Sequence, residues 1–344
     1  MSIQSCLFGE LPSGETIDLF RLTNAQGLKV EILTLGATLR QVSLPAANAA
    51  DVTITLGHAA LGSYIDKACY FGSTIGRVCN RIANGAFELE GRKYQLATND
   101  HDRHHLHGGD LGFDRRVWRG QATALAGEDR VTLRRVSPAG EEGYPGNLEV
   151  EVIYRLTDDN RLRIEYTAST DQPTPVNLTN HAFWNLAGPN ATILDHELLL
   201  CAQAYLPVDE TLIPTGEQRR VADSPMDFRH FQRVGGQINQ VPGGYDHCYI
   251  LDKQEMSFAK AAVLSDPQSG RSMEIYTTEP GIQFYSGNFL DGSDGQGQRM
   301  FQQHGGLCLE AQKFPNSVNS QSFPTTVLKP TETYRQVTEH RFAW

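Results

Sequence analysis

The chain of 344 residues carries 40 acidic and 30 basic side chains, which gives a formal net charge of −10 and an isoelectric point near 5.6. This balance argues against a nucleic-acid partner, because binding to a polyanion depends on clustered Lys and Arg. No apolar run reaches the roughly 18 residues that a membrane-spanning helix needs, and the first residues lack the basic start and apolar stretch of a secretory signal.

The cysteines lie far apart and form no CxxC pair, which in a chain of this length predicts reduced, mostly buried thiols in a cytoplasmic protein. They are Cys6, Cys69, Cys79, Cys201, Cys248 and Cys308. No linker, low-complexity segment, charge run or internal repeat divides the sequence, so we expect one domain over residues 1–344. We expect a monomer or a weak homodimer.

Period-two alternation of apolar and polar residues is the main pattern along the chain, and helical periodicity rarely lasts for two turns. Alternating runs at Leu28–Ile32, Val131–Val136 and Met273–Tyr276 predict strands. The clearest signal is a pair of alternating runs, 148–156 and 162–168, around an Asp-Asp-Asn turn, which predicts a hairpin. With 32 glycines and 16 prolines to supply turns, the chain is predicted to be all-β, a large antiparallel β-sandwich.

The first polar cluster in chain order is GRVCNRIANG, which contains Asn80 and Arg81. Taken alone, Arg81 is typical of a surface salt bridge. The flanking asparagines, Asn80 and Asn84, favour a hydrogen-bonding loop instead.

A histidine-rich segment, HDRHHLHGG, follows at residues 101–109. On a strand, His105 and His107 would point to the same face and could share a metal ion. The glutamate that would complete such a site a few residues later is missing, so His101, His104 and His105 are interpreted as loop residues without a ligand, and no metal site is predicted. His107 differs, because the two glycines after it leave backbone room for a ligand to approach.

The segment NLTNHAFWNL places His181 among amide side chains and next to Phe183 and Trp184. This pattern fits a packed strand whose polar groups are hydrogen-bonded. It fits a sugar site equally well, since apolar sugar faces stack on aromatic rings while hydroxyls bind amides and carboxylates. Either interpretation predicts a partly desolvated His181.

Two carboxylates complete the set of candidate residues. Asp246 follows Gly-Gly-Tyr and is, by itself, typical of a turn. Glu310 lies at the end of an apolar run that stops at Pro315. A carboxylate base, an imidazole acid and groups that grip hydroxyls would together form a proton-transfer site for a sugar.

Several segments, in order, resemble the aldose 1-epimerase family of the galactose mutarotase type. They span nearly the whole chain and read TIGRVCNRIANGAFELEGRKYQL, HLHGG, NLTNHAFWNLAG, GGYDHCY, TEPGIQFYSGNFL and CLEAQKFPNSVNSQSFPTTVLKPTETY. The resemblance implies a galactose mutarotase-like β-supersandwich, which agrees with the alternation found independently. It also implies an isomerase that interconverts the α and β anomers of free aldohexoses such as D-galactose and D-glucose.

The resemblance further implies a role for each candidate residue. Glu310 corresponds to the general base that takes the proton of the C1 hydroxyl, and His181 to the general acid that protonates the ring oxygen. His107 corresponds to a second histidine near the ring oxygen. The residues that would lie around the rest of the sugar are Arg81, Asn80, Asp246 and Phe284.

The chemistry of this reaction sets requirements on the site. Opening a cyclic hemiacetal removes one proton from O1 while another reaches O5, and rotation about C1–C2 then presents the other carbonyl face. At neutral pH this requires an ionised Glu310 and a His181 that can give a proton. No redox change and no stable carbanion occurs, so we expect no cofactor.

Two positions depart from the family pattern. Ala311 stands where Thr is frequent, which removes a hydroxyl beside the proposed base and could alter the orientation of Glu310. Asn316 stands where Asp is frequent, and the loop Asn99–Arg103 is more charged than usual.

Other functions stay open. A glycosidase would use Glu310 and Asp246 as paired carboxylates, roughly 5 Å apart for retention or roughly 6.5–9.5 Å apart for inversion. A non-catalytic sugar-binding module would need the gripping residues but not both Glu310 and His181. An epimerase for phosphorylated hexoses would need an additional basic pocket.

Overall fold

The structure is a computed structural model that describes residues 2–46, 50–66, 70–292, 295–296 and 299–344. Within these residues strands predominate, and the one α-helix is the six-residue α1 (Leu61–Asp66). Three sheets make up most of the fold, and the pairings inside them are antiparallel. The prediction of an all-β antiparallel sandwich is therefore confirmed.

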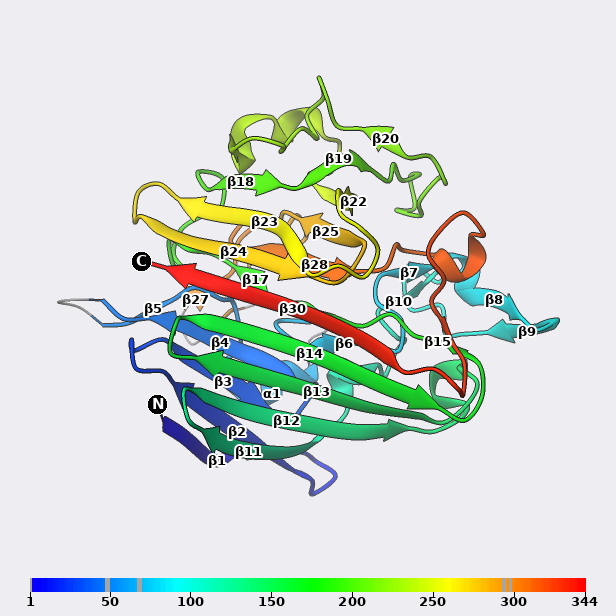
Figure 1. Cartoon of the computed structure of the whole chain (residues 1–344), viewed down its shortest axis with the longest axis horizontal. Helices are drawn as coiled ribbons and strands as arrows, with labels where there is room; N and C mark the ends of the chain where they lie inside the picture. Colours follow the sequence, from blue (N-terminus) through cyan, green and yellow to red (C-terminus); the bar gives the residue numbers. More distant parts are fainter. Residues whose placement is uncertain (1, 47–49, 67–69, 293–294, 297–298) are drawn as a thin grey trace.

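The largest sheet has nine strands and forms the front layer in Figure 1, with β30 across its middle. In spatial order its strands are β11 (Arg119–Leu125), β12 (Glu128–Ser137), β13 (Leu148–Thr157), β14 (Arg161–Thr170), β30 (Tyr334–Ala343), β24 (Arg271–Thr277), β23 (Ala259–Asp266), β18 (Glu197–Leu200) and β21 (Gln232–Arg233).

Two further sheets cover the inner face of this layer. The five-stranded sheet contains β1 (Ser2–Glu10), β2 (Thr16–Thr23), β3 (Lys29–Leu33), β4 (Thr38–Leu44) and β5 (Val52–Thr53). The six-stranded sheet contains, in spatial order, β17 (Phe183–Trp184), β28 (Leu307–Gln312), β25 (Gly281–Tyr285), β22 (Asp246–Leu251), β19 (Ala202–Tyr205) and β20 (Arg219–Arg220). One apolar cluster joins all three sheets, and Ile32, Val152, Ile275 and Ile282 are among its members.

The predicted hairpin is present as β13 and β14. Its register pairs Leu156 with Leu162, and buried and less buried residues alternate along both strands. Asn160 in the turn adopts the left-handed region with φ of 62°, which asparagine tolerates better than most residues. The other predicted runs fall on β3, β12 and β24, but β3 is buried on both faces because a second apolar cluster covers its outer side.

Pairs of very short strands hold the loops beside the six-stranded sheet. β7 (Arg81–Ile82) pairs with β10 (His105–Leu106), and β6 (Thr74–Ile75) pairs with β16 (Thr179–Asn180). The remaining pairs are β8 (Ala86–Leu89) with β9 (Arg92–Gln95), β15 (Thr174–Pro175) with β29 (Val327–Leu328), and β26 (Gly295–Gln296) with β27 (Arg299–Met300). Single 3-10 turns occur at Ala83–Gly85, Phe113–Arg115, Glu141–Gly143, Val234–Gly236, Ile238–Gln240 and Ser317–Asn319.

The cysteines that the structure describes are all free thiols, as predicted. Cys79, Cys248 and Cys308 are buried, whereas Cys201 is half-buried and Cys6 is exposed. Cys69 lies outside the described residues. No helix in the described part of the chain is long and apolar enough to span a membrane.

Candidate active site

A cavity of about 210 Å³ opens beside the strands β25 and β28. This volume lies below the roughly 300–1,000 Å³ typical of sites for drug-sized ligands, so it suits a ligand of monosaccharide size. Its walls contain every site residue predicted from the sequence except Phe284. The lining residues are Tyr70, Asn80, Arg81, Leu106, His107, His181, Phe183, Asp246, Tyr285, Phe289, Leu290 and Glu310.

Glu310 lies on β28, the strand between β17 and β25, where the residue is 2% exposed. Its Oε1 atom is 3.8 Å from Nε2 of His181, and its Oε2 atom has no hydrogen-bond partner among the described residues. Burial raises the pKa of Glu310 well above its ordinary value, and the carboxyl of Asp246 raises it further while Arg81 lowers it. A desolvated carboxyl with an unpaired oxygen is typical of a group that exchanges a proton with a ligand.

His181 follows β16 directly, and its backbone fixes it at the cavity wall. Its N–H donates to the carbonyl of Ser73 at 3.0 Å, and its carbonyl accepts from the N–H of Gly72 at 2.9 Å. The ring centroid lies 5.1 Å from that of His107 and 5.6 Å from that of Tyr70. Burial lowers the pKa of His181 to about 4, so the imidazole is neutral at pH 7.

His107 is held by Asn80 through two hydrogen bonds. The backbone N–H of His107 donates to the Asn80 carbonyl at 3.1 Å, and the backbone N–H of Asn80 donates to Nδ1 of His107 at 3.2 Å. Burial, followed by the neighbouring His181, lowers the pKa of His107 well below its ordinary value. A neutral imidazole that accepts at Nδ1 carries its proton on Nε2, so His107 is fixed as a hydrogen-bond donor at Nε2.

The glycines after His107 serve a different purpose from the one expected. A Cβ on Gly108 would lie 1.8 Å from the Gly76 carbonyl oxygen, and one on Gly109 would lie 2.1 Å from Oε2 of Glu142. The expectation that they leave room for a ligand is therefore wrong, since other parts of the chain fill that space. The close packing fixes the loop, in which His107 itself has φ of 52°.

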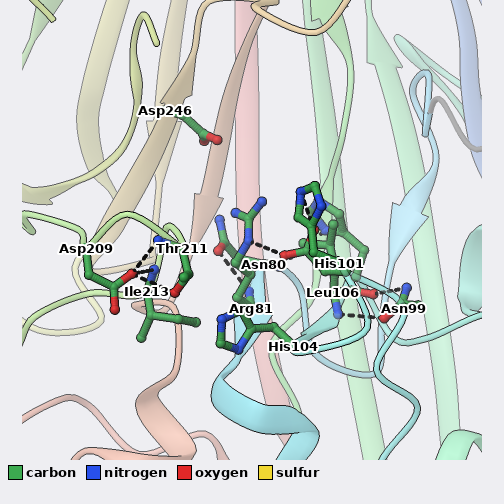
Figure 2. Close-up of polar contacts among 12 residues, drawn as sticks. Asn80, Arg81, Asn99, His101, His104, Leu106, Asp209, Thr211, Ile213 and Asp246 are labelled. Carbon is green, nitrogen blue, oxygen red and sulfur yellow. Dashed lines mark hydrogen bonds and ion pairs between the residues drawn. The ribbon is translucent and has the colours of Figure 1, made fainter. Parts of the chain in front are cut away.

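An ion pair with Asp100 anchors Arg81 through its Nε atom and leaves the two terminal nitrogens of the guanidinium unengaged by other described residues. Its Nε donates to Oδ2 of Asp100 at 2.8 Å. Figure 2 shows Arg81 beside Asn80. Its Nη atoms have no hydrogen-bond partner within the described ranges, and the residue lines the cavity below Asp246 in the same view. Arg81 can therefore grip a ligand with both of its terminal nitrogens.

Asp246 lies at the start of β22, where Nε2 of Gln283 donates to its Oδ1 at 2.7 Å. Burial raises the pKa of Asp246, while Arg81 and the bond from Gln283 lower it. Gln283 is paired with Glu310 in the β25–β28 register and had no distinctive signal in the sequence. It fixes one oxygen of Asp246 and leaves the other available to a hydroxyl.

Phe284 is not at the cavity, which corrects the prediction from the sequence. It is fully buried and stacks on Tyr245, with 4.9 Å between ring centroids. Because side chains alternate along β25, the next residue, Tyr285, faces the cavity instead. Tyr285 stacks on Phe289, which is 71% exposed, and the two rings form one aromatic wall.

Tyr70 is a cavity residue that sequence reasoning missed. Its ring centroid lies 4.7 Å from that of His107, so it covers both histidines. The isolated CYFG context of Tyr70 offers no periodic or charge signal that could have indicated this position.

The other histidines of the 101–107 segment do not join the site. Nδ1 of His105 contacts the Ala97 carbonyl at 2.8 Å and its Nε2 contacts the Tyr144 hydroxyl at 2.8 Å, so His105 and His107 do not share a metal position. Nδ1 of His104 accepts from the backbone N–H of Asn84 at 3.0 Å. His101 is exposed.

One group of side chains in the described residues has donor atoms close enough to share a metal ion. His181, Cys308 and Glu310 offer atoms that all lie within 4.8 Å of one another. A metal ion would need the thiolate of Cys308, yet burial and the carboxyl of Glu310 raise the pKa of this thiol well above its ordinary value. This group therefore fits proton transfer better than metal binding.

The two departures from the family pattern have little effect on the cavity. Ala311 follows Glu310 on β28, so its side chain points to the opposite face of the sheet, and a hydroxyl there would not lie beside the carboxyl. Oδ1 of Asn316 accepts from the backbone N–H of Ala83 at 3.0 Å, and its own N–H donates to the Arg81 carbonyl at 2.9 Å. Asn316 thus supports the loop that carries Arg81.

An all-β sandwich with a buried carboxyl and two imidazoles in a cavity of this size fits an enzyme that transfers protons on a sugar. Comparison with known proteins identifies the family. The family model described as aldose 1-epimerase matches residues 18–341, and the chain belongs to the aldose 1-epimerase family of isomerases that act on carbohydrates.

Individual relatives agree with this assignment. Galactose mutarotase of Mus musculus is 43% identical over 348 residues, which cover 100% of this chain and 99% of the relative. Aldose 1-epimerase of Escherichia coli (strain K12) is 36% identical over 338 residues, 96% of each chain. The crystal structure of galactose 1-epimerase from Lactobacillus acidophilus NCFM superimposes with a TM-score of 0.87 at 27% identity, covering 99% of this chain and 98% of that one.

Proposed function

We propose that this protein interconverts the α and β anomers of free aldohexoses such as D-galactose and D-glucose. The observation that carries the proposal is the 3.8 Å approach of His181 Nε2 to Glu310 Oε1 inside a cavity of monosaccharide size. The relatives named galactose mutarotase support galactose as a substrate. The ligand is a single monosaccharide, and no cofactor takes part in the chemistry.

Ring opening begins when Glu310 takes the proton of the C1 hydroxyl and His181 gives a proton to the ring oxygen. The C1–O5 bond then breaks, and a free aldehyde forms. Rotation about C1–C2 presents the other face of the carbonyl, and closure reverses both transfers to give the other anomer. Each proton transfer contributes on the order of 10²–10⁴-fold to the rate.

The reaction starts from an ionised Glu310 and a His181 that can give a proton, whereas burial favours a neutral Glu310 and a neutral His181. Both distributions hold the same number of protons. The neutral pair is the one present after ring opening, when Glu310 has received the O1 proton and His181 has lost its own. The site therefore favours the protonation state of the open-chain intermediate, while the guanidinium of Arg81 favours the ionised Glu310 that starts the reaction.

The remaining residues hold the sugar in place. Arg81, Asn80 and Asp246 offer donors and acceptors to hydroxyls, and Tyr285 with Phe289 offers an aromatic surface to an apolar sugar face. His107 donates a hydrogen bond from Nε2 toward the ring oxygen.

The direct test is polarimetry or anomer-resolved NMR on freshly dissolved α-D-galactose and α-D-glucose. We expect the protein to accelerate approach to anomeric equilibrium without releasing the aglycone of aryl glycosides. Absence of acceleration on several aldoses would refute the enzymatic proposal. Aglycone release without anomer interconversion would favour a glycosidase that uses Glu310 and Asp246.

The pH dependence of kcat/KM should show a wide plateau. His181 and Glu310 share one proton, so no net titration occurs between the lowered pKa of His181, about 4, and the raised pKa of Glu310. The rate should fall below about pH 4, where the pair binds a second proton, and again above the raised Glu310 pKa, where it loses its only one. Rates corrected for spontaneous anomerisation test both limbs when they are measured from below the His181 pKa of about 4 upward. A sharp loss of rate near pH 6.5, which is about the ordinary pKa of histidine, would contradict the prediction.

Arg81→Lys should mainly weaken substrate binding. Lysine keeps the charge but lacks the guanidinium, which can bind Asp100 and a sugar hydroxyl at the same time. KM should therefore rise on the order of 10–100-fold, which corresponds to the loss of one hydrogen bond to a charged group. Arg229→Lys is the control, because Arg229 binds Asp227 by two hydrogen bonds outside the cavity. An unchanged KM in Arg81→Lys would show that Arg81 does not hold the sugar.

A further inference from the structure

We propose that the sulfur of Cys308 is a positioning group for His181, accepting a hydrogen bond from Nδ1–H so that Nε2 is kept free to exchange protons. This inference rests on the proposed function for its catalytic consequence, but the contact itself is a property of the free protein. Cys308 does not line the cavity and is not itself a catalytic residue.

One strand supplies both groups that flank the imidazole. Cys308 and Glu310 are two residues apart on β28, so their side chains leave the same face of the sheet. Sγ of Cys308 lies 3.6 Å from Nδ1 of His181, and Oε1 of Glu310 lies 3.8 Å from Nε2. The β-strand therefore presents a sulfur to one ring nitrogen and a carboxyl to the other.

The position of the Cys308 thiol is fixed by the strand, and the thiol stays protonated. Cys308 is 0% exposed, and its backbone pairs with Phe183 on one side and Tyr285 on the other. Burial and the nearby carboxyls of Glu310 and Asp246 raise the pKa of the thiol well above its ordinary value, so sulfur stays in the neutral S–H form.

The direction of the hydrogen bond follows from the chemistry at Nε2. When an imidazolium gives its Nε2 proton to the ring oxygen, the neutral ring that remains holds its proton on Nδ1. Ring closure needs the same form, because Nε2 must then have a lone pair to receive the hydroxyl proton. Nδ1 therefore keeps its proton through the whole cycle, and Cys308 Sγ is the atom positioned to accept it.

A neutral sulfur is suited to this position for an electrostatic reason. A carboxylate at Nδ1 would orient the ring but would also stabilise the imidazolium and weaken it as an acid. Sulfur is a weak, uncharged acceptor, so it fixes the tautomer without adding to the basicity of the ring.

His107 provides the opposite case in the same cavity. Its Nδ1 accepts from the backbone N–H of Asn80, so its proton is on Nε2 and it can only donate there. Two neighbouring imidazoles with rings 5.1 Å apart thus hold opposite tautomers. His181 transfers protons, whereas His107 donates a fixed hydrogen bond. Cys308 determines the tautomer of His181, and Asn80 determines the tautomer of His107.

Nitrogen NMR of the histidine side chains in the full-length protein tests the tautomer directly, with His181→Asn identifying the His181 signals. We expect a protonated Nδ1 and a bare Nε2 on His181, and the reverse on His107. Cys308→Ala should give His181 a mixture of tautomers and lower kcat about threefold to tenfold with KM unchanged, since one hydrogen bond is lost. Cys308→Ser, which restores an acceptor, should restore the Nδ1–H signal.

Cys248→Ala is the matched control, because Cys248 is also a buried thiol but packs against Leu206 and Phe314 in a separate apolar cluster. It should change neither the His181 tautomer nor kcat. A wild-type His181 protonated at Nε2, or an unchanged tautomer in Cys308→Ala, would overturn the inference. If the wild-type protein shows the Nδ1–H signal but does not accelerate anomerisation, the proposed function is refuted, while the hydrogen bond between Cys308 and His181 still stands.

Discussion

Glu310→Gln should lower kcat for anomer interconversion by about 10²–10⁴-fold while the protein stays folded. Glutamine has nearly the same shape but cannot take the proton of the C1 hydroxyl. The cavity wall and the strand pairing of β28 with β25 should be preserved, because the register there depends on backbone hydrogen bonds. Polarimetry with D-galactose measures the rate, and thermal unfolding measures the stability of the same samples.

The stability of Glu310→Gln provides an independent readout. A carboxyl whose pKa is raised on folding contributes stability at pH below its unfolded pKa, and this contribution is lost as the pH rises through the folded pKa. Glutamine does not titrate, so the variant should become progressively more stable than wild type as the pH rises above the ordinary carboxyl pKa. Loss of activity with a gain in stability would separate a catalytic role from a structural one.

Glu279→Gln is the control for a buried carboxyl. Glu279 is 1% exposed, burial raises its pKa to about 7, and it does not line the cavity. This variant should show a similar trend in stability with pH but keep wild-type kcat. Wild-type kcat in Glu310→Gln would exclude Glu310 as the general base.

The sequence predicted those strands that have one face buried in the core and the other face exposed to solvent. The β13–β14 hairpin met this condition, because its apolar residues face the core and its polar residues face outward. β3 did not, because Glu31 is buried on the outer face through ion pairs with Arg21 and Arg40. The two-residue strands that carry Arg81 and His105 are too short for any period to be detected.

The candidate site was predictable where polar residues stand in unusual apolar surroundings, as with Glu310 and His181. It was not predictable where strand register decides the outcome, and a shift of one residue separates Phe284 in the core from Tyr285 at the cavity. The contact of Cys308 with His181 joins residues 127 positions apart, and the protonation of both site groups depends on burial. Neither property can be derived from the order of residues alone.

His181→Asn should also lower kcat by about 10²–10⁴-fold. Asparagine can hydrogen-bond the ring oxygen but cannot deliver a proton to it, so the C1–O5 bond would have to break to an unprotonated leaving oxygen. The backbone bonds to Ser73 and Gly72 do not involve the imidazole, so the segment should keep its place. Anomer-resolved NMR at saturating D-galactose measures kcat.

His196→Asn is the control, because His196 is also a buried histidine whose pKa is lowered by burial. Burial lowers the pKa of His196 to about 4, as it does for His181, but its Nε2 accepts from the backbone N–H of Leu186 at 2.9 Å and it does not line the cavity. The control should lose stability and keep kcat. A wild-type kcat in His181→Asn would instead assign the acid role to His107, the other imidazole at the cavity.

The double variant Glu310→Gln/His181→Asn distinguishes one proton-transfer unit from two separate groups. If the groups acted independently, the two losses would multiply to about 10⁴–10⁸-fold. Each transfer is of use only when the other occurs, because bond opening needs O1 to lose a proton and O5 to gain one. The double variant should therefore be no slower than the slower single variant, measured with enough enzyme for each rate to exceed spontaneous anomerisation. A multiplicative loss would mean that the 3.8 Å contact between Nε2 and Oε1 does not couple the two residues in the reaction.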